Sequence, residues 1–193
     1  GVDGIFNEIF MYGGESLVSA TWKFYQAIWE GEEFPKIWSK GIIFPIFKGG
    51  DLEAEKDRKY RGITLLSVLG KLFTVILKNR VEEWCERHEL LAEEQAGFRR
   101  NRSTTDHLFT LTELIKARSP LKAYCCFLDI QKAYDRVWRE ALWTKLYEYG
   151  IRGKMWRVIK SIYADVESCV KINDQLTRFF KIELGLRQGC ILS

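Results

Sequence analysis

The sequence predicts an α+β fold that is rich in helix and has a small antiparallel sheet. Apolar residues recur at every third or fourth position in several segments, which is typical of amphipathic helices. Short apolar or alternating segments lie between them and have the composition of strands. Strands and helices do not alternate strictly along the chain, so a doubly wound parallel sheet is not expected.

The N-terminal elements follow from composition and periodicity. Residues 15–30 place large apolar side chains on one helical face, and Pro35 closes that element. Residues 41–47 (GIIFPIF) indicate a short buried strand, because the segment is too apolar and β-branched for a surface helix. Residues 48–62 are polar and of mixed charge, and we expect a loop or the tip of a hairpin.

Two further helices are predicted in the middle of the chain. A long apolar pattern with helical spacing runs from about residue 65 to residue 91. Residues 92–103 are loop-like in composition. Ser103 is expected to cap the next helix, with Asp106 at the capping-box position, and that helix continues to about Arg118.

The last third of the chain mixes strands and helices. Residues 123–129 (AYCCFLD) predict a compact, buried strand that ends in an acid. Helices are expected at 139–149 and 152–164. Alternating apolar residues at 168–173 and 179–184 predict a β-hairpin.

Composition excludes several classes of protein. With 47% hydrophobic and 29% charged residues, the 193-residue chain has ordinary globular usage and is neither disordered nor fibrous. No segment approaches the roughly 18 consecutive apolar residues of a membrane span. We expect no signal peptide, because no basic-then-apolar leader follows Gly1, and we expect an intracellular protein.

Charge and cysteine usage narrow the classes further. Residues 1–35 carry six acidic side chains and one lysine, whereas residues 36–193 carry 29 basic and 20 acidic ones. That asymmetry allows a polyanionic partner, although a basic surface usually serves solubility. The five cysteines form no C-x-x-C motif and accompany only two histidines, which favours reduced thiols over a zinc site or a disulfide framework.

Asp129 is the first candidate for chemistry. It ends the predicted buried strand, so its carboxylate is expected to emerge at an edge and could hold a hard cation such as Mg²⁺. The alternative is that Asp129 only forms a turn, as most aspartates at strand ends do.

Two cations flank the polar segment after the first strand. Lys48 precedes two glycines, and Arg61 lies at the other end of the same segment. A hairpin of this kind can fold both cations over a triphosphate. The alternative is a solvated loop, which four acidic residues in the segment support. A Walker-type loop is excluded, because Gly70-Lys71 is followed by Leu72 and lacks the upstream glycine.

Two glycine-containing loops are further candidates. Gly97, Phe98 and Arg99 begin a run with one aromatic residue and three arginines, which suits a phosphate backbone with a base stacked nearby. The alternative is a loop that Phe98 anchors to the core. Residues 185–190 (GLRQGC) follow the predicted hairpin and indicate by themselves only a structural turn.

Taken in order, these segments resemble the reverse transcriptases of LINE-type (non-LTR) retrotransposons over nearly the whole chain. The landmarks are residues 1–5 (GVDGI), 38–41 (WSKG), 45–48 (PIFK), 60–67 (YRGITLLS), 94–99 (EQAGFR), 103–106 (STTD), 128–135 (LDIQKAYD) and 185–193 (GLRQGCILS). Each is a weak pattern alone. Their occurrence together, in the family's order and spacing, makes the resemblance specific.

The resemblance implies a right-hand polymerase architecture and its chemistry. Fingers and fingers–palm helices would occupy about residues 1–122, and a partial palm with an antiparallel sheet about residues 123–193. Asp129 would be the metal-binding carboxylate of the first palm motif, with the Ile130 carbonyl as a further ligand. Two Mg²⁺ ions would orient a DNA primer and a deoxynucleoside triphosphate for RNA-templated nucleotidyl transfer.

The resemblance also implies roles for the other candidates. Lys48 and Arg61 would neutralise the triphosphate. Tyr134 would lie under the incoming sugar and exclude a 2′-hydroxyl. The remaining matched residues would contact the nucleotide (Gln188 and Gly189) or the template strand (Gly97, Phe98 and Arg99).

Some expected features of the family are missing or changed. Phe6 and Gly62 stand where prolines are common in relatives. The second palm motif, an aromatic-Ala-Asp-Asp hairpin, and the thumb would follow the last motif found here. The similar residues 163–166 (YADV) precede that motif and have a valine in place of the second acid. We therefore expect this polypeptide alone not to polymerise DNA. A primer-extension assay with Mg²⁺ tests this, and incorporation that Asp129→Ala abolishes would contradict it.

Two other functions stay open on the sequence. One is a non-catalytic nucleic-acid-binding or interaction protein that derives from such an element. The other is an RNA-templated RNA polymerase, against which Tyr134 and the LINE-like order of motifs argue. No oligomeric state is predicted.

Overall fold

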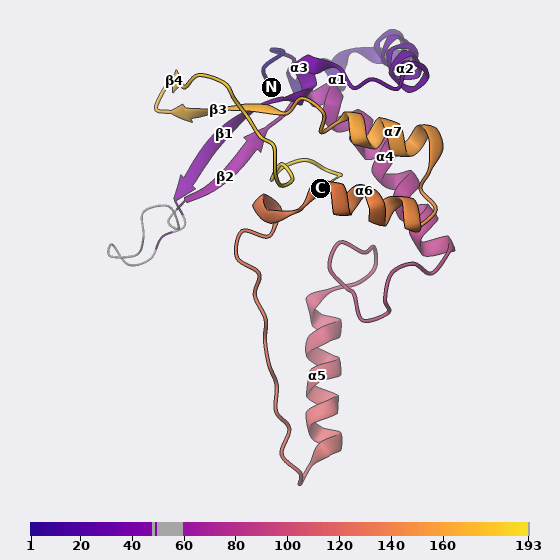
Figure 1. The fold of residues 1–193 in the computed structure, drawn as a ribbon, viewed down its shortest axis with the longest axis vertical. Helices are drawn as coiled ribbons and strands as arrows, with labels where there is room; N and C mark the ends of the chain where they lie inside the picture. Colours follow the sequence, from indigo (N-terminus) through magenta and orange to yellow (C-terminus); the bar gives the residue numbers. More distant parts are fainter. Residues whose placement is uncertain (48, 50–59, 193) are drawn as a thin grey trace. The chain divides into compact units, whose positions relative to one another are not determined.

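A computed structural model describes residues 1–47, 49 and 60–192 (Figure 1). The chain forms two compact units. The first comprises Gly1–Glu82 together with Lys132–Ser193, and the second comprises Glu83–Gln131. The predicted fingers (about residues 1–122) and palm (about 123–193) are functional parts, and their boundary differs from those of the compact units. The division into fingers and palm stays a prediction.

The first unit contains the predicted hairpin around the polar segment. Strand β1 (Lys40–Phe47) pairs antiparallel with β2 (Tyr60–Leu65), from Ile42 opposite Leu65 to Phe47 opposite Tyr60. Residues 41–47 are therefore a strand, as predicted. The tip, which includes Lys48, lies outside the described residues.

The predicted C-terminal hairpin forms with two short return strands. Strand β3 (Glu167–Ile172) pairs antiparallel with β4 (Gln175–Leu176) and β5 (Phe180–Lys181). β3 also pairs with β1, and that pair is parallel. The prediction of an antiparallel sheet is thus wrong in one of its pairs. The long chain between β1 and β3 passes through several helices and returns in the same direction, as a parallel neighbour requires.

Among its described residues, the first unit contains all or part of six helices and one 3-10 turn. They are α1 (Asn7–Tyr12), α2 (Gly14–Gly31), α3 (Lys36–Ser39), α4 (Val68–Arg87), η2 (Tyr134–Arg136), α6 (Arg139–Glu148) and α7 (Gly153–Ser161). The predicted helices at 15–30, 65–91, 139–149 and 152–164 correspond to α2, α4, α6 and α7.

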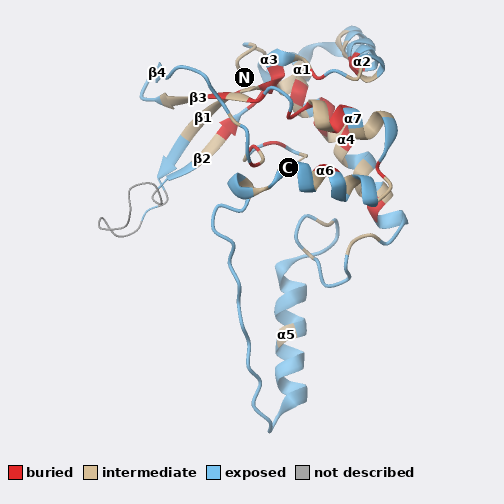
Figure 2. Ribbon diagram, viewed as in Figure 1, coloured by how far each residue is buried: buried red, intermediate tan, exposed pale blue. Residues whose placement is uncertain are grey.

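The core of the first unit centres on Trp38, which lies in the short α3. Its ring lies 5.4 Å from that of Phe24 and 5.4 Å from that of Phe34, and 6.3 Å from that of Tyr25. Edge-to-face aromatic pairs each add about 0.5–1.5 kcal/mol to the hydrophobic gain of burial. Buried residues extend from this cluster into α4, α7 and the start of β3 (Figure 2).

The N-terminal segment is tied to the start of α4. Ser67 caps this helix, because its hydroxyl accepts the Gly70 N–H at 3.2 Å. The same hydroxyl donates to the Asp3 carboxylate at 2.5 Å. The GVDGI landmark therefore has a structural role in positioning α4.

In the second unit, α5 (Thr104–Arg118) begins as predicted. Ser103 and Asp106 form the capping box, and the Ser103 N–H donates to Asp106 Oδ2 at 2.7 Å. None of the residues in α5 is buried (Figure 2).

The predicted strand at residues 123–129 is not formed. This segment is irregular, and Tyr124, Phe127 and Leu128 are 89%, 82% and 91% exposed. A strand needs a neighbour to satisfy its backbone groups and to cover its side chains, and the second unit contains no strand within its described residues. No described helix of the chain is long and apolar enough to cross a membrane.

Candidate functional site

The turn that contains Tyr134 is hydrogen-bonded to the loop at residues 185–189. The Leu186 N–H donates to the Tyr134 carbonyl at 2.7 Å, and the Gly185 N–H donates to the Val137 carbonyl at 3.0 Å. Gly185 has a φ of +79°, and a Cβ there would lie 2.7 Å from the Tyr134 and Asp135 carbonyl oxygens. Only glycine fits this position without displacing backbone.

The same loop also lies against β2. The Thr64 N–H donates to the Gln188 carbonyl at 2.9 Å. Gly189 has a φ of +113°, and a Cβ there would approach the Thr64 oxygen to 2.7 Å. Arg61 lies three residues before Thr64 on β2 and is exposed. Backbone hydrogen bonds thus connect the elements that carry Tyr134, Gln188, Gly189 and Arg61.

Two arginines hold this loop, of which Arg187 is buried and Arg139 is partly buried. Arg187 donates from Nη1 to the carbonyls of Trp38 at 3.1 Å and Ser39 at 3.2 Å. Arg139 donates from Nε to the Gly185 carbonyl at 2.8 Å. Neither guanidinium pairs with a described carboxylate, and burial lowers the pKa of both side chains. In the sequence, only the position of Arg187 between Gly185 and Gly189 could have marked it as a residue of this loop.

Residues 163–166 have a structural role in the first unit. Tyr163 and Val166 are buried just after α7, whereas Ala164 and Asp165 are exposed. The guanidinium carbons of Arg139 and Arg187 lie 5.2 Å and 5.8 Å from the centre of the Tyr163 ring. This segment therefore supports the side chains of Arg139 and Arg187.

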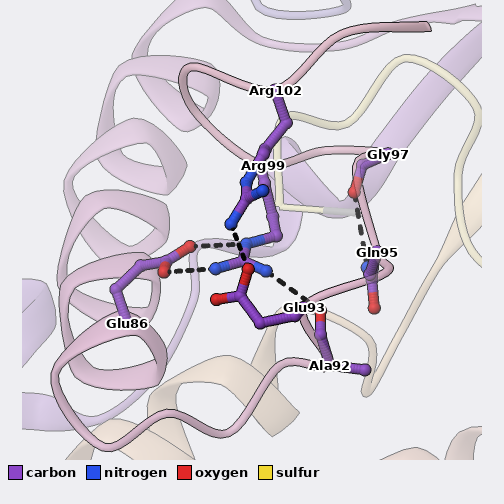
Figure 3. Close-up of polar contacts among 7 residues, drawn as sticks. All are labelled: Glu86, Ala92, Glu93, Gln95, Gly97, Arg99 and Arg102. Atoms are coloured by element: carbon purple, nitrogen blue, oxygen red, sulfur yellow. Dashed lines mark hydrogen bonds and ion pairs between the residues drawn. The ribbon is translucent and has the colours of Figure 1, made fainter. Parts of the chain in front are cut away.

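Arg99, in the second unit, is held by a carboxylate (Figure 3). Its Nε and Nη2 donate to Glu86 Oε1 and Oε2 at 3.0 Å and 2.8 Å, and its Nη1 donates to the Ala92 carbonyl at 3.0 Å. The Arg99 side chain is only 8% exposed. The hydrogen bond from Arg99 lowers the pKa of Glu86, and the same bond raises the pKa of Arg99. The geometry gives Arg99 a bracing role in this loop, and contact with a template stays a prediction.

Two neighbours of Arg99 differ from it. Phe98 is 82% exposed and has a φ of +62°, so the alternative that it anchors the loop in a core is wrong. Gly97 is exposed, and its carbonyl accepts a hydrogen bond from Gln95 Nε2 at 3.3 Å. Arg102 pairs with Glu93 in the same loop (Figure 3).

The predicted metal ligands lie in the irregular part of the second unit. Asp129 and Ile130 are both exposed. Within the described ranges 1–47, 49 and 60–192, no group of three or more His, Cys, Asp or Glu side chains could hold a metal ion. The metal roles of Asp129 and Ile130 stay predictions.

Comparison with known proteins defines the class. Residues 53–193 match the family described as "Reverse transcriptase (RNA-dependent DNA polymerase)". The chain belongs to this family. It is 33% identical over 170 residues to the probable RNA-directed DNA polymerase from transposon BS of Drosophila melanogaster, which covers 87% of the chain and 18% of that protein.

Two further relatives are also transposon proteins by their names. The probable RNA-directed DNA polymerase from transposon X-element of Drosophila melanogaster is 31% identical over 87% of the chain and 18% of its own length. The transposon TX1 uncharacterized 149 kDa protein of Xenopus laevis is 28% identical over 100% of the chain and 15% of its own length. The chain thus spans less than a fifth of each of these relatives.

Proposed function

We propose that this chain binds nucleotide and template in a longer polymerase that copies RNA into DNA. The observation that carries the proposal is the hydrogen-bonded junction of the Tyr134 turn, the loop at 185–189 and β2. Three segments distant in sequence meet there. Each carries a residue that the resemblance assigns to the incoming nucleotide.

Each residue has a chemical role in this proposal. Arg61, with Lys48 from the same hairpin, offsets the charge of the triphosphate by charge-assisted hydrogen bonds. The Tyr134 ring lies against the sugar and leaves no room for a 2′-hydroxyl. Gln188 and Gly189 contact the base and the template nucleotide.

The loop with Phe98 takes the template strand. The exposed Phe98 ring offers a face on which an unpaired base can stack. Arg99 positions this loop through Glu86. Gly97 lets the template backbone approach.

The chemistry of the family depends on a divalent metal ion, and the proposal assigns Asp129 and the Ile130 carbonyl to it. Mg²⁺ prefers oxygen ligands in octahedral geometry and is commonly held by one or two carboxylates with waters and substrate phosphates. A carboxylate and a carbonyl are suitable donors, but they are fewer than a two-metal site needs, so no catalytic step is derived from them.

Photocrosslinking of labelled dTTP to the chain, in the presence of an RNA template and a DNA primer, tests the nucleotide site. Arg61→Gln should reduce crosslinking about tenfold, because hydrogen bonds to a charged group contribute about 1.5–3 kcal/mol. Arg178→Gln is the matched control, since Arg178 is exposed and its side chain makes no hydrogen bond or ion pair with the described residues.

Tyr134→Ala separates the sugar role from general binding. It should leave dTTP crosslinking largely intact and increase UTP crosslinking, because the ring no longer excludes the 2′-hydroxyl. Equal losses for Arg61→Gln and Arg178→Gln, or unchanged discrimination in Tyr134→Ala, would contradict the proposed site.

A further inference from the structure

The hairpin of α6 and α7 has an unusual balance of charge. Residues 138–164 carry six basic side chains and only two acidic ones. A groove of about 530 Å³ lies between the two helices and residues 183–184. Four of its lining residues are aromatic and two are cations that pair with no described carboxylate, namely Trp138, Trp143, Trp156, Tyr163, Arg139 and Lys160.

The basic residues in and beside the groove differ in their partners. Lys154 pairs with Glu30 at 2.8 Å, and Arg157, which also lines the groove, pairs with Glu32. Lys160 instead lies with its Nζ 4.9 Å from the centre of the Trp156 ring, and no described carboxylate pairs with it.

Arg139 is the second cation in the lining of the groove that pairs with no described carboxylate, and it is partly buried. Its Nε and Nη1 donate only to backbone carbonyls, and its Nη2 has no hydrogen-bond partner there. The charge of Arg187 lies near it, across the Tyr163 ring. Two carboxylates at the rim, Glu140 and Glu183, are exposed and pair with neither groove cation. An anion in the groove would offset the uncompensated positive charge.

The aromatic lining adds a second requirement on the ligand. Trp138 is 68% exposed although it directly precedes α6. Trp156 is fixed, because its Nε1 donates to the Trp143 carbonyl at 2.9 Å. A wide, exposed indole beside cations that no described carboxylate neutralises suits a ligand with both a flat ring and a negative charge.

We propose that this groove binds a nucleotide of a single-stranded nucleic acid, with the phosphate at Lys160 and the base stacked on Trp138. The groove is formed by other residues than the site that Arg61, Tyr134 and Gln188 define, so the proposal does not depend on that site. The chain then contacts a single strand at a surface additional to the polymerase site.

Fluorescence anisotropy with a labelled 12-nucleotide oligouridylate and the complete chain tests the proposal. Lys160→Gln should weaken binding severalfold and reduce the slope of log affinity against log salt by about 1, the signature of one lost phosphate contact. Lys154→Gln is the matched control, because Lys154 lies on the same helix, is paired with Glu30 and does not line the groove. It should change neither quantity.

Trp138→Ala tests the stacking. It should weaken binding about tenfold, because base–aromatic stacking contributes substantially for each base, and it should leave the salt slope unchanged. A base-paired RNA of the same length should bind independently of Trp138, since its bases are not free to stack on the indole.

Three outcomes would overturn the proposal. One is equal weakening by Lys160→Gln and Lys154→Gln, which would mean a general charge effect. Another is unchanged affinity in both groove variants, which would leave the groove to a protein partner or to no ligand. The third is displacement of the labelled oligonucleotide by UTP at a concentration as low as that of unlabelled oligonucleotide needed for the same displacement. This would make the occupant a free nucleotide. Circular dichroism of each variant verifies its folding.

Discussion

The two units of the chain cover their apolar side chains to very different degrees. In the first unit, Leu77, Val158, Ile162 and Cys169 are almost completely buried. In the second unit, α5 has no buried residue, and the apolar run that includes Phe127 is exposed (Figure 2). One unit has a core of its own, whereas the other has helix and loop with little burial.

The difference shows which elements the local sequence specifies and which elements form only beside a neighbouring strand. Helix α5 forms because its hydrogen bonds are internal and its capping box satisfies the first turn. The segment at 123–129 has as strong a strand composition as β1, but a strand obtains its hydrogen bonds only from another strand. Composition therefore predicted both strands, and only β1 forms.

The largest expected effect comes from the aromatic core of the first unit. Trp38→Ala should lower the free energy of unfolding by about 3–5 kcal/mol, because it leaves a cavity among Phe24, Tyr25 and Phe34. Urea unfolding followed by circular dichroism measures this.

Phe127→Ala is the comparison variant in the second unit. Its ring is already exposed, so the free energy of unfolding should change by less than about 0.5 kcal/mol. A loss in Phe127→Ala as large as that in Trp38→Ala would mean that the second unit has a core as well, and the contrast between the units would fail.

An intermediate effect is expected from the glycines of the two candidate loops. Gly189→Ala forces a positive φ on an L-residue and places its Cβ against the Thr64 oxygen, which should cost about 1–3 kcal/mol. Hydrogen exchange at the Thr64 amide measures the disturbance of this loop directly, because this N–H donates to the Gln188 carbonyl.

Gly97→Ala should change the stability by less than about 0.5 kcal/mol, since a Cβ there meets no atom within 4 Å. Similar losses at Gly97 and Gly189 would show that the loop of the second unit is as tightly fitted as that of the first.

The sequence predicted the elements whose signals are local. Ser103 and Asp106 marked the start of α5, and the apolar periodicity of residues 15–30 marked α2. The parallel pairing of β1 with β3 was not predictable, because residues 40–43 and 167–170 are far apart and their alternation does not specify a partner.

The candidate site shows the same limit. The resemblance identified Tyr134, Gln188 and Gly189, and the backbone hydrogen bonds that join their segments are now visible. It did not identify Arg139 and Arg187, because nothing local distinguishes a buried arginine from a surface one. It also did not indicate that Arg99 pairs with Glu86, which lies 13 residues earlier on a helix.

The smallest expected effect concerns the ion pair that braces the loop of the second unit. Glu86 accepts two hydrogen bonds from Arg99, which lowers its pKa below the ordinary value of 4.5. A carboxylate with a lowered pKa in the folded state stabilises that state fully above about pH 4.5. The contribution is lost as the pH falls through the lowered pKa of Glu86.

Acidification should therefore loosen residues 92–102 while the buried Phe73 and Leu77 of the first unit stay protected, which hydrogen exchange corrected for pH can measure. Helix α7 is not a suitable reference, because its Arg157 pairs with Glu32, whose pKa is lowered in the same way. Glu86→Gln should produce the same loosening at neutral pH. Glu83→Gln is the control, because Glu83 pairs with Arg87 inside α4 and does not contact the loop. If Phe73 and Leu77 lose protection as early as residues 92–102, the two units do not differ in their dependence on burial and ion pairing. If only residues 92–102 respond, the second unit depends on exposed polar contacts where the first depends on its core.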